Sequence, residues 1–261
     1  MHTVKNILMK KHAENAMVSP LKISIVIPAF NEERLLGASL AKIRDAAQAF
    51  SRRAWAVELI VCDNNSTDKT AEIARSAGAT VVFEPVNQIA RARNCGAAAA
   101  TGDWLVFVDA DSHPSAELFD DVAGQIVAGR CLAGGCTLRL DEHFFVAGLI
   151  TRSWNFVSRV GRLLAGSFIF CETAAFRELG GFSLELFAAE EIELSGRLKK
   201  LAAKKGRTVV ILHRHPLVTS ARKMRLYTGR EHLAFMVRAI FRQRRTLTNR
   251  EASYLWYDGR R

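Results

Sequence analysis

Residues 103–114, which read DWLVFVDADSHP, join a short apolar run to two closely spaced aspartates. The run from Leu105 to Val108 is typical of a buried strand, because a short apolar stretch bounded by polar residues fits the interior of a sheet. Asp109 and Asp111 follow at once, and carboxylates so close together at the edge of a core repel each other. The stretch therefore predicts a buried strand whose end needs a source of positive charge.

Strand and helix patterns alternate on the N-terminal side of this stretch. Strands are expected at 22–30 (KISIVIPAF), 57–63 (VELIVCD), 79–84 (ATVVFE) and 104–110 (WLVFVDA). Helices are expected at 31–50 and 87–102, and a turn followed by a helix at 64–78. The alternation predicts an α/β fold with a mostly parallel sheet flanked by helices. Ligands of such sheets bind where the carboxyl ends of the strands converge. We therefore expect Asp63, Asp109, Asp111 and the segment PAFNEE at 28–33 to meet at one cleft.

The composition is that of a folded protein with one large domain. The chain has 261 residues, of which 49% are hydrophobic and 24% charged, so it can bury a sizeable core. Its formal net charge of +11 favours anionic partners, namely nucleotide phosphates, nucleic acid or an anionic membrane surface. No nucleic-acid recognition motif accompanies the charge, so we expect no nucleic-acid partner.

The cysteines and the apolar segments indicate the compartment. Five cysteines without a CxxC pair are typical of free thiols in a reducing environment. The first 20 residues contain no apolar run of the length that a signal peptide needs. The longest apolar region, residues 144–170, is interrupted by Arg152, Arg159 and Arg162 and falls short of a spanning helix. We expect a cytoplasmic protein, and a peripheral position on the inner face of the cytoplasmic membrane stays open.

Two readings of the aspartate pair follow from its residues alone. Oxygen ligands in a cluster attract Mg²⁺ or Mn²⁺, which complete their coordination with substrate phosphates, so Asp-x-Asp after a strand suits a metal and diphosphate site. The alternative is that Asp111 and Ser112 cap a helix that begins near Pro114.

Five segments occur in an order and spacing that resemble a known family. They are SIVIPAFNEE at 24–33, ELIVCDNNSTDKT at 58–70, ARARNCGAAAATGDWLVFVDADS at 90–112, GGF at 180–182 and EEIELSGRLKK at 190–200. Together they resemble the family 2 glycosyltransferases, which have the Rossmann-like GT-A fold. The resemblance covers about residues 22–223. It implies an inverting transfer of a sugar from a nucleotide-diphosphate sugar, dependent on Mn²⁺ or Mg²⁺.

The resemblance also implies a domain organisation. An N-terminal arm is expected over residues 1–20, the GT-A domain over 21–223, and a basic, helical C-terminal extension over 224–261.

The resemblance implies donor-binding roles for the residues that match the family's motifs. Glu32 and Asp63 are expected to contact the ribose and base, with Pro28 and Phe30 forming the pocket wall. The alternative for Glu32 is that Asn31 caps the following helix and the acids suit its first turn.

Basic residues are also expected on the donor side. Arg93 matches a basic family residue near the donor, with Arg91 as a neighbour, although a solvated helix face is the alternative for both. Arg222 matches a position that clamps the pyrophosphate, a task suited to guanidinium. Asn64 and Asn65 replace the second and third residues of the usual Asp-Asp-Gly-Ser motif, which removes a charge.

The metal is expected to lie at the aspartate pair. The resemblance implies that Asp109 faces the ribose and metal and that Asp111 is the direct metal ligand. His213 or His215 is either an extra metal ligand or a surface residue.

The catalytic base is expected in the EEIEL segment. The family's Glu-Asp motif falls on Glu190 and Glu191, which gives Glu191 the place of the base that accepts the acceptor proton. Adjacent helical residues diverge by about 100°, so one of the pair points into the site, and we favour Glu191 over Glu190. Gly180 and Gly181 ahead of it allow a close approach of backbone to sugar, or form a helix C-cap.

Two regions bear on the acceptor, which is expected to be a saccharide, a small molecule or a lipid-linked hydroxyl. Apolar residues recur at helical spacing with arginines between them: Phe145, Leu149, Trp154, Val157, Val160 and Leu164. Such a helix lies on a membrane or packs against the sheet. The basic C-terminal segment suits anionic headgroups, a protein partner or solvent.

A different class of function is also open. The altered Glu-Glu motif and Asn64 are compatible with a non-catalytic protein that binds a nucleotide sugar in a degenerate active site. A nucleotidyltransferase is disfavoured, because a glycine-rich phosphate loop should then follow the first strand.

Overall fold

The computed structural model describes residues 21–142 and 145–222. The predicted N-terminal arm (1–20) and C-terminal extension (224–261) lie outside these residues, so their boundaries and the expected helix stay predictions.

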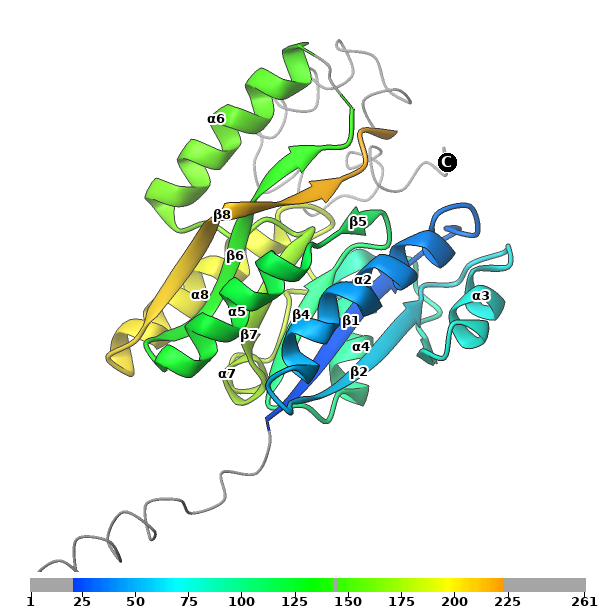
Figure 1. The fold of residues 1–261 in the computed structure, drawn as a ribbon, viewed down its shortest axis with the longest axis horizontal. Helices are drawn as coiled ribbons and strands as arrows, with labels where there is room; N and C mark the ends of the chain where they lie inside the picture. The colour runs from blue at the N-terminus through cyan, green and yellow to red at the C-terminus, as the bar shows by residue number, and fades with distance from the viewer. Residues whose placement is uncertain (1–20, 143–144, 223–261) are drawn as a thin grey trace, which may run out of the picture.

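One eight-stranded sheet organises the described chain (Figure 1). Its order is β3-β2-β1-β4-β7-β6-β8-β5. The bounds are β1 Lys22–Ala29, β2 Ala56–Asp63, β3 Thr80–Phe83, β4 Trp104–Val108, β5 Ser112–His113, β6 Cys131–Leu140, β7 Phe168–Glu172 and β8 Thr208–Thr219. The pairs β1–β2, β1–β4, β2–β3 and β6–β8 are parallel, while β7 and β5 run against their neighbours. The prediction of a mostly parallel α/β sheet is confirmed.

Helices cover both faces of the sheet. Their bounds are α2 Leu36–Ser51, α3 Thr70–Ser76, α4 Ile89–Ala99, α5 Ala116–Ala128, α6 Phe145–Gly161, α7 Thr173–Glu178 and α8 Glu190–Lys204. One core joins the sheet to α2, α3 and α5, and a second joins the opposite face to α4, α7 and α8. β1 and β4 are almost continuously buried, as strands covered on both faces must be.

The predicted strands and helices of the first 110 residues all form, with small differences at their ends. α2 begins at Leu36, and its N-cap residue is Leu35. The alternative in which Asn31 caps this helix is therefore wrong. α5 begins at Ala116 and is capped by Ser115, whose Oγ accepts from the Leu118 amide, so the helix-cap alternative for Asp111 and Ser112 is also wrong.

The second half of the sheet lies next to the loop that contains Asp109 and Asp111, which we call the aspartate loop. β7 pairs antiparallel with β4 over its whole length, and β6 then pairs with β7. Gly134 in β6 admits the ring of Phe170, which a side chain at that position would overlap. β8 runs along β6 and ends beside β5, so that the chain after Thr219 returns to the end of β4.

The expected helix in which arginines are interspersed among apolar residues forms as α6. It lies against β6 and β8 at one end of the molecule (Figure 1). Within residues 21–142 and 145–222, no helix has both the length and the apolar character needed to cross a membrane.

Candidate active site

The carboxyl ends of three neighbouring parallel strands bring the predicted donor residues together. β1 leads into Phe30 and Glu32, β2 ends on Asp63, and β4 is followed by Asp109. Ala29 and Asp63 are partners in the β1–β2 register, so the two loops start side by side. Asp63 is 7% exposed, and its Oδ1 accepts from the Ser66 amide at 3.0 Å. Pro28 is buried in β1, and Phe30 is half-buried just beyond its end.

Arg222 reaches this site from the end of the described chain. Its Nη1 and Nη2 donate to the two carboxylate oxygens of Glu32, at 2.8 and 2.6 Å. Its Nη2 also lies 3.6 Å from Oδ2 of Asp111. The Ser220 amide donates to the carbonyl of Asp111, which fixes the chain after β8 beside the aspartate loop. Burial lowers the pKa of Arg222, but its hydrogen bonds to Glu32 outweigh this effect and the pKa is raised.

Arg93 of α4 lies at the centre of the site. Its guanidinium donates to Oε1 of Glu190 at 2.6 Å, to Oδ1 of Asp109 at 3.0 Å and to the carbonyl of Gly166 at 2.9 Å. It also lies over the ring of Phe182, 5.3 Å from the ring centre. Burial lowers the pKa of Arg93, but the surrounding carboxylates raise it above its ordinary value. The residue is 2% exposed, so the solvated-face alternative for Arg93 is wrong.

The repulsion between the two aspartates is offset by two arginines that are far apart in the sequence, Arg93 and Arg222. Asp109 pairs with Arg93, and Asp111 faces Arg222. Their side chains are 25% and 15% exposed, so both carboxylates stay accessible to a ligand. Asp109 and Asp111, two positions apart in the sequence, thus belong to two charge clusters.

The donor atoms suit a cation that shares its coordination with a substrate. Asp109 and Asp111 supply hard oxygen ligands, which fit Mg²⁺ or Mn²⁺. Among the described residues no group of three or more His, Cys, Asp or Glu side chains is placed to hold a metal ion. A cation at this pair would therefore take further ligands from a diphosphate and water, as Mg²⁺ ordinarily does.

The histidines lie in other environments. His215 pairs with Asp121 of α5, with Nδ1 and Oδ2 2.9 Å apart. His213 is exposed on β8. His113 contacts Ser39 and Lys42 of α2. Burial, followed by the charge of Lys42, lowers the pKa of His113.

The two glutamates at the start of α8 have different surroundings. Glu190 is 3% exposed and is held by Arg93. Glu191 is next in the helix, and burial, reinforced by the charge of Glu190, raises its pKa to about 8. Proton acceptors in catalysis work best with a pKa near the working pH. Glu190 is therefore held in an ion pair with Arg93, whereas burial favours the protonated form of Glu191.

Asn64 and Asn65, which replace the second and third residues of the usual Asp-Asp-Gly-Ser motif, differ in their surroundings. Asn64 is buried, and its amide nitrogen donates to the carbonyls of Glu84 and Val86 at 3.2 and 2.7 Å. Its side-chain oxygen accepts from the Gln88 amide at 2.9 Å. Asn64 thereby ties the end of β2 to the loop before α4. Asn65 is exposed and adopts a left-handed conformation with φ 64°, which asparagine tolerates.

Two residues that the sequence analysis did not select connect the donor side to α8. Asn94 donates to the carbonyl of Phe182 and accepts from its amide, both at 2.9 Å. Gln88 donates to the carbonyls of Leu184 and Leu186 at 3.0 and 2.9 Å. The segment that precedes Glu190 is thus fastened to α4. The signal for Asn94 was its place next to Arg93, but its partner could not be read from the sequence.

The two glycines of the GGF segment end α7. The amides of Gly180 and Gly181 donate to the carbonyls of Arg177 and Phe176, in the pattern of a Schellman C-cap. Both glycines have a positive φ, 74° and 75°. The C-cap interpretation is confirmed for Gly180, and Gly181 packs directly against Asn94.

Known proteins share this architecture. Among solved structures, Staphylococcus aureus TarS (residues 1–349) in complex with UDP-GlcNAc superposes with a TM-score of 0.62 at 19% identity, covering 90% of this chain and 69% of that one. Glucosyl-3-phosphoglycerate synthase from Mycobacterium tuberculosis, in complex with Mn²⁺, UDP and glucosyl-3-phosphoglycerate, gives 0.61 at 20% identity, covering 88% and 82%. At these identities the likeness establishes the fold.

Sequence comparison establishes the family. An uncharacterized glycosyltransferase of Mycobacterium bovis is 34% identical over 142 residues, which are 54% of this chain and 56% of that protein. The match thus spans just over half the length of this curated relative. The sequence model of Glycosyl transferase family 2 matches residues 24–177, the part that runs from within β1 through β7 and contains both aspartates. The chain belongs to glycosyl transferase family 2.

Proposed function

We propose that the protein is an inverting, metal-dependent glycosyltransferase that moves a sugar from a nucleotide-diphosphate sugar to an acceptor hydroxyl. The observation that carries the proposal is the position of Arg93, which joins Asp109 at the end of β4 to Glu190 at the start of α8. The donor-side carboxylates and the proposed base are thereby held in one site. Family membership and the nucleotide complexes of the two structural neighbours support a UDP-type donor.

The donor is proposed to bind across the ends of β1, β2 and β4. Glu32 and Asp63 contact the ribose and base, and Pro28 and Phe30 form the wall of the base pocket. Asp63 has one carboxylate oxygen occupied by the Ser66 amide, so its other oxygen serves the nucleotide.

Two arginines are proposed to serve the anionic part of the donor. Nη2 of Arg222 lies 3.6 Å from Oδ2 of Asp111, which supports a role for this guanidinium beside a diphosphate bound at that aspartate. Arg93 holds Asp109 in position toward the ribose. Fork-shaped guanidinium groups suit both tasks, because they bond two oxygens at once.

Asp111, with Asp109 beside it, is the proposed ligand pair for Mn²⁺ or Mg²⁺. When bound there, a divalent cation stabilises the negative charge of the departing diphosphate. Mn²⁺ is present in the complex of the mycobacterial synthase.

Glu191 is the proposed catalytic base. Its carboxylate accepts the proton of the acceptor hydroxyl while that oxygen forms a bond to the anomeric carbon. The bond from the anomeric carbon to the diphosphate oxygen breaks on the opposite face, and its electron pair leaves with the nucleoside diphosphate. The configuration at the anomeric carbon is therefore inverted. Glu190 stays paired with Arg93 and positions the start of α8.

The acceptor is proposed to be a saccharide, a small molecule or a lipid-linked hydroxyl. The domain boundaries are proposed as residues 21–223 for the GT-A domain, with 1–20 and 224–261 as flanking segments.

The donor site is tested by thermal unfolding with a panel of nucleoside diphosphates, with and without Mn²⁺. A ligand of the native state at 100 times its Kd adds about 2.7 kcal/mol to the free energy of unfolding. We expect a Mn²⁺-dependent rise in melting temperature with one base, lost in Asp111→Ala. Asp45→Ala, an exposed carboxylate on α2, is the matched control and should keep the shift. The absence of a shift with every nucleotide would contradict the donor assignment.

Catalysis is tested separately by sugar transfer or donor hydrolysis with the nucleotide sugar selected in this way. Glu191→Gln should bind the donor and lose turnover, while Glu185→Gln, an exposed control, should keep it. Donor binding without turnover in the unaltered chain, across saccharide and lipid-linked acceptors, would instead favour the non-catalytic binding protein.

A further inference from the structure

α6 packs against the sheet with its polar side. The side-chain amide of Asn155 donates to the carbonyl of Leu138 and accepts from its amide, both at 2.9 Å, so it joins the helix to β6. Ser158, three residues later on the same side, is 1% exposed and donates to the carbonyl of Leu163. The face of α6 that meets the protein is thus held by hydrogen bonds.

The opposite side of α6 is apolar and exposed. Phe156 is 69% exposed, Val160 71% and Leu149 60%, and their spacing of four and seven residues places them on one helical face. Val157 and Ile150 extend this face and are also exposed. The interpretation in which this stripe packs against the sheet is therefore wrong for these residues. We call this surface, formed by Leu149, Ile150, Phe156, Val157 and Val160, the α6 apolar face.

Basic side chains border the α6 apolar face, and acidic ones are missing from the segment. No aspartate or glutamate occurs between Glu142 and Glu172. Arg152 and Arg159 are exposed on the helix itself, and Arg162 follows its end. An exposed apolar face with arginines along its edge is typical of helices that lie in the interface of a membrane.

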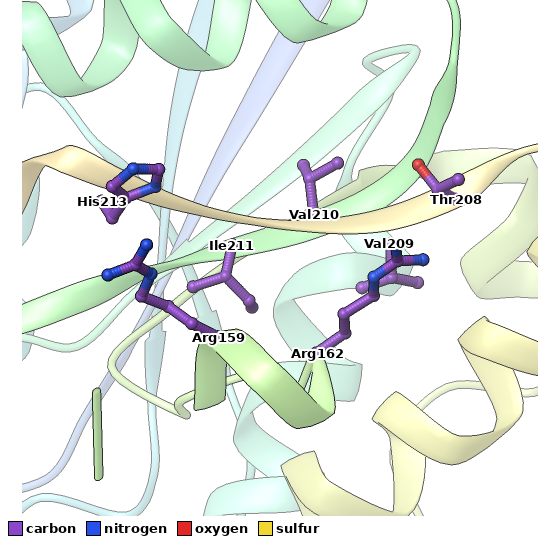
Figure 2. Close-up of a pocket in the computed structure, with 7 residues that line it drawn as sticks. All are labelled: Arg159, Arg162, Thr208, Val209, Val210, Ile211 and His213. Carbon is purple, nitrogen blue, oxygen red and sulfur yellow. The ribbon is translucent and has the colours of Figure 1, made fainter. Parts of the chain in front are cut away.

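A basic hollow lies next to this edge. Arg159, Arg162 and His213 line a hollow of about 310 Å³ over β8, together with Thr208, Val209, Val210 and Ile211. Figure 2 shows the side chains of Arg159 and Arg162 extending from the end of α6 toward the strand. Cationic heads over an apolar floor suit a lipid phosphate group more than a neutral sugar.

We propose that the α6 apolar face docks on an anionic lipid surface. Phe156, Val160 and Leu149 enter the boundary between headgroups and acyl chains, while Arg152, Arg159 and Arg162 lie at the phosphates. This inference concerns a surface outside the donor cleft and does not depend on the proposed transfer reaction.

The charge around the α6 apolar face favours an anionic lipid surface over two protein partners, a second copy of the chain and the segment after Arg222. A second copy packed face to face through α6 would bring both sets of arginines together without a compensating acid. The residues after Arg222 contain ten Lys and Arg but three Asp and Glu, so this segment of the chain carries the same sign as the border of the face. An anionic bilayer has the complementary sign and attracts basic residues that lie near its surface.

The docking surface is joined to the active site by a short loop. After α6 the Leu164 amide donates to Oγ of Ser195 in α8, and the Gly166 carbonyl accepts from Arg93. A bilayer that holds α6 therefore lies one short loop from the centre of the site.

The test is cosedimentation of the full chain with vesicles of phosphatidylcholine alone and of phosphatidylcholine mixed with phosphatidylglycerol. We expect binding to the anionic vesicles only. Phe156→Ser and Val160→Ser should each lower the partition constant about tenfold. Val127→Ser is the matched control, because Val127 is 69% exposed on α5, on another surface.

Charge variants give a second readout. Arg159→Glu should weaken binding to anionic vesicles about tenfold or more, since the reversal removes one favourable charge and adds a repulsive one. Arg75→Glu, an exposed arginine on α3, should leave binding nearly unchanged. Each variant is first compared with the unaltered chain in melting temperature, so that loss of folding is recognised.

Three results would overturn the proposal. They are no binding to anionic vesicles, binding that the Phe156 and Arg159 variants do not change, and a fall in oligomeric state of Phe156→Ser by analytical ultracentrifugation. The last result would mean that a second copy covers the face. Nucleotide-dependent thermal shifts are measured on the same samples, so a failed lipid interaction and a failed donor assignment are distinguished.

Discussion

Arg93 and Glu190 form an ion pair in which Nη1 and Oε1 are 2.6 Å apart and the side chains are 3% and 4% exposed. The pair connects α4 to the first residue of α8. Glu191 follows directly in the helix, and burial, reinforced by the charge of Glu190, raises its pKa to about 8.

Removing one member of this pair should be costly. Arg93→Met leaves the buried carboxylate of Glu190 without its cation, and we expect a loss of about 3–5 kcal/mol in the free energy of unfolding, measured by urea denaturation. The double variant Arg93→Met/Glu190→Met removes both charges and should recover a large part of the loss. A single variant as stable as the double one would contradict the importance of the pair.

Activity should depend on the protonation of Glu191. Its pKa of about 8 means that the carboxylate is mostly protonated at neutral pH. A base works in its deprotonated form, so kcat/KM should rise with pH and level off above about 8. Glu191→Gln should abolish this profile together with turnover. A flat profile in the unaltered chain would argue against Glu191 as the base.

The same group should make folding stability pH-dependent. Because the pKa is raised from 4.5 to about 8 in the folded state, the folded chain holds this proton more tightly than the unfolded chain. The stabilisation is complete below about 4.5 and is lost as the pH rises through about 8. Subtracting the pH-stability curve of Glu191→Gln from that of the unaltered chain should reveal this slope, and parallel curves would contradict it.

Asn64 should be intolerant of the aspartate that many relatives carry in the second motif. Asn64→Asp replaces a donor by an acceptor facing the carbonyls of Glu84 and Val86. We expect a loss of about 1–3 kcal/mol by urea denaturation, the cost of unsatisfied buried polar groups. Asn65→Asp is the matched control, since Asn65 is exposed and aspartate also tolerates its positive φ. Equal stability of the two variants would mean that the loop contacts of Asn64 contribute little.

The two glycines after α7 should differ in their response to alanine. Both have φ near 75°, which costs alanine about 1–2 kcal/mol in either position. A Cβ at Gly181 would lie 2.5 Å from Oδ1 of Asn94, whereas a Cβ at Gly180 meets no atom within 4 Å. Gly181→Ala should therefore lower the melting temperature more than Gly180→Ala and should also disturb the Asn94–Phe182 bonds. Equal shifts would show that Asn94 can move away without cost.

The first half of the sheet and the residue types at its carboxyl edge could be predicted from local sequence patterns. β1, β4 and the end of β2 are recognisable because burial on both faces imposes apolar runs, and the polar residues that follow mark the carboxyl edge of the sheet. Periodicity and end signals are local properties, so they are readable without knowledge of the partners.

The ion pairs between distant residues and the exposure of one face of α6 follow from tertiary packing. Arg222 bonds to Glu32 across 190 positions, and Arg93 bonds to Glu190 across 97. The same pairing of distant segments distinguished Glu190 from Glu191. It also turned the polar side of α6 toward β6 through Asn155 and left Phe156 in contact with solvent. Helical spacing predicts the angle between two side chains of the same helix. Which residues those side chains contact depends on where distant strands pack, and this is set by the fold as a whole.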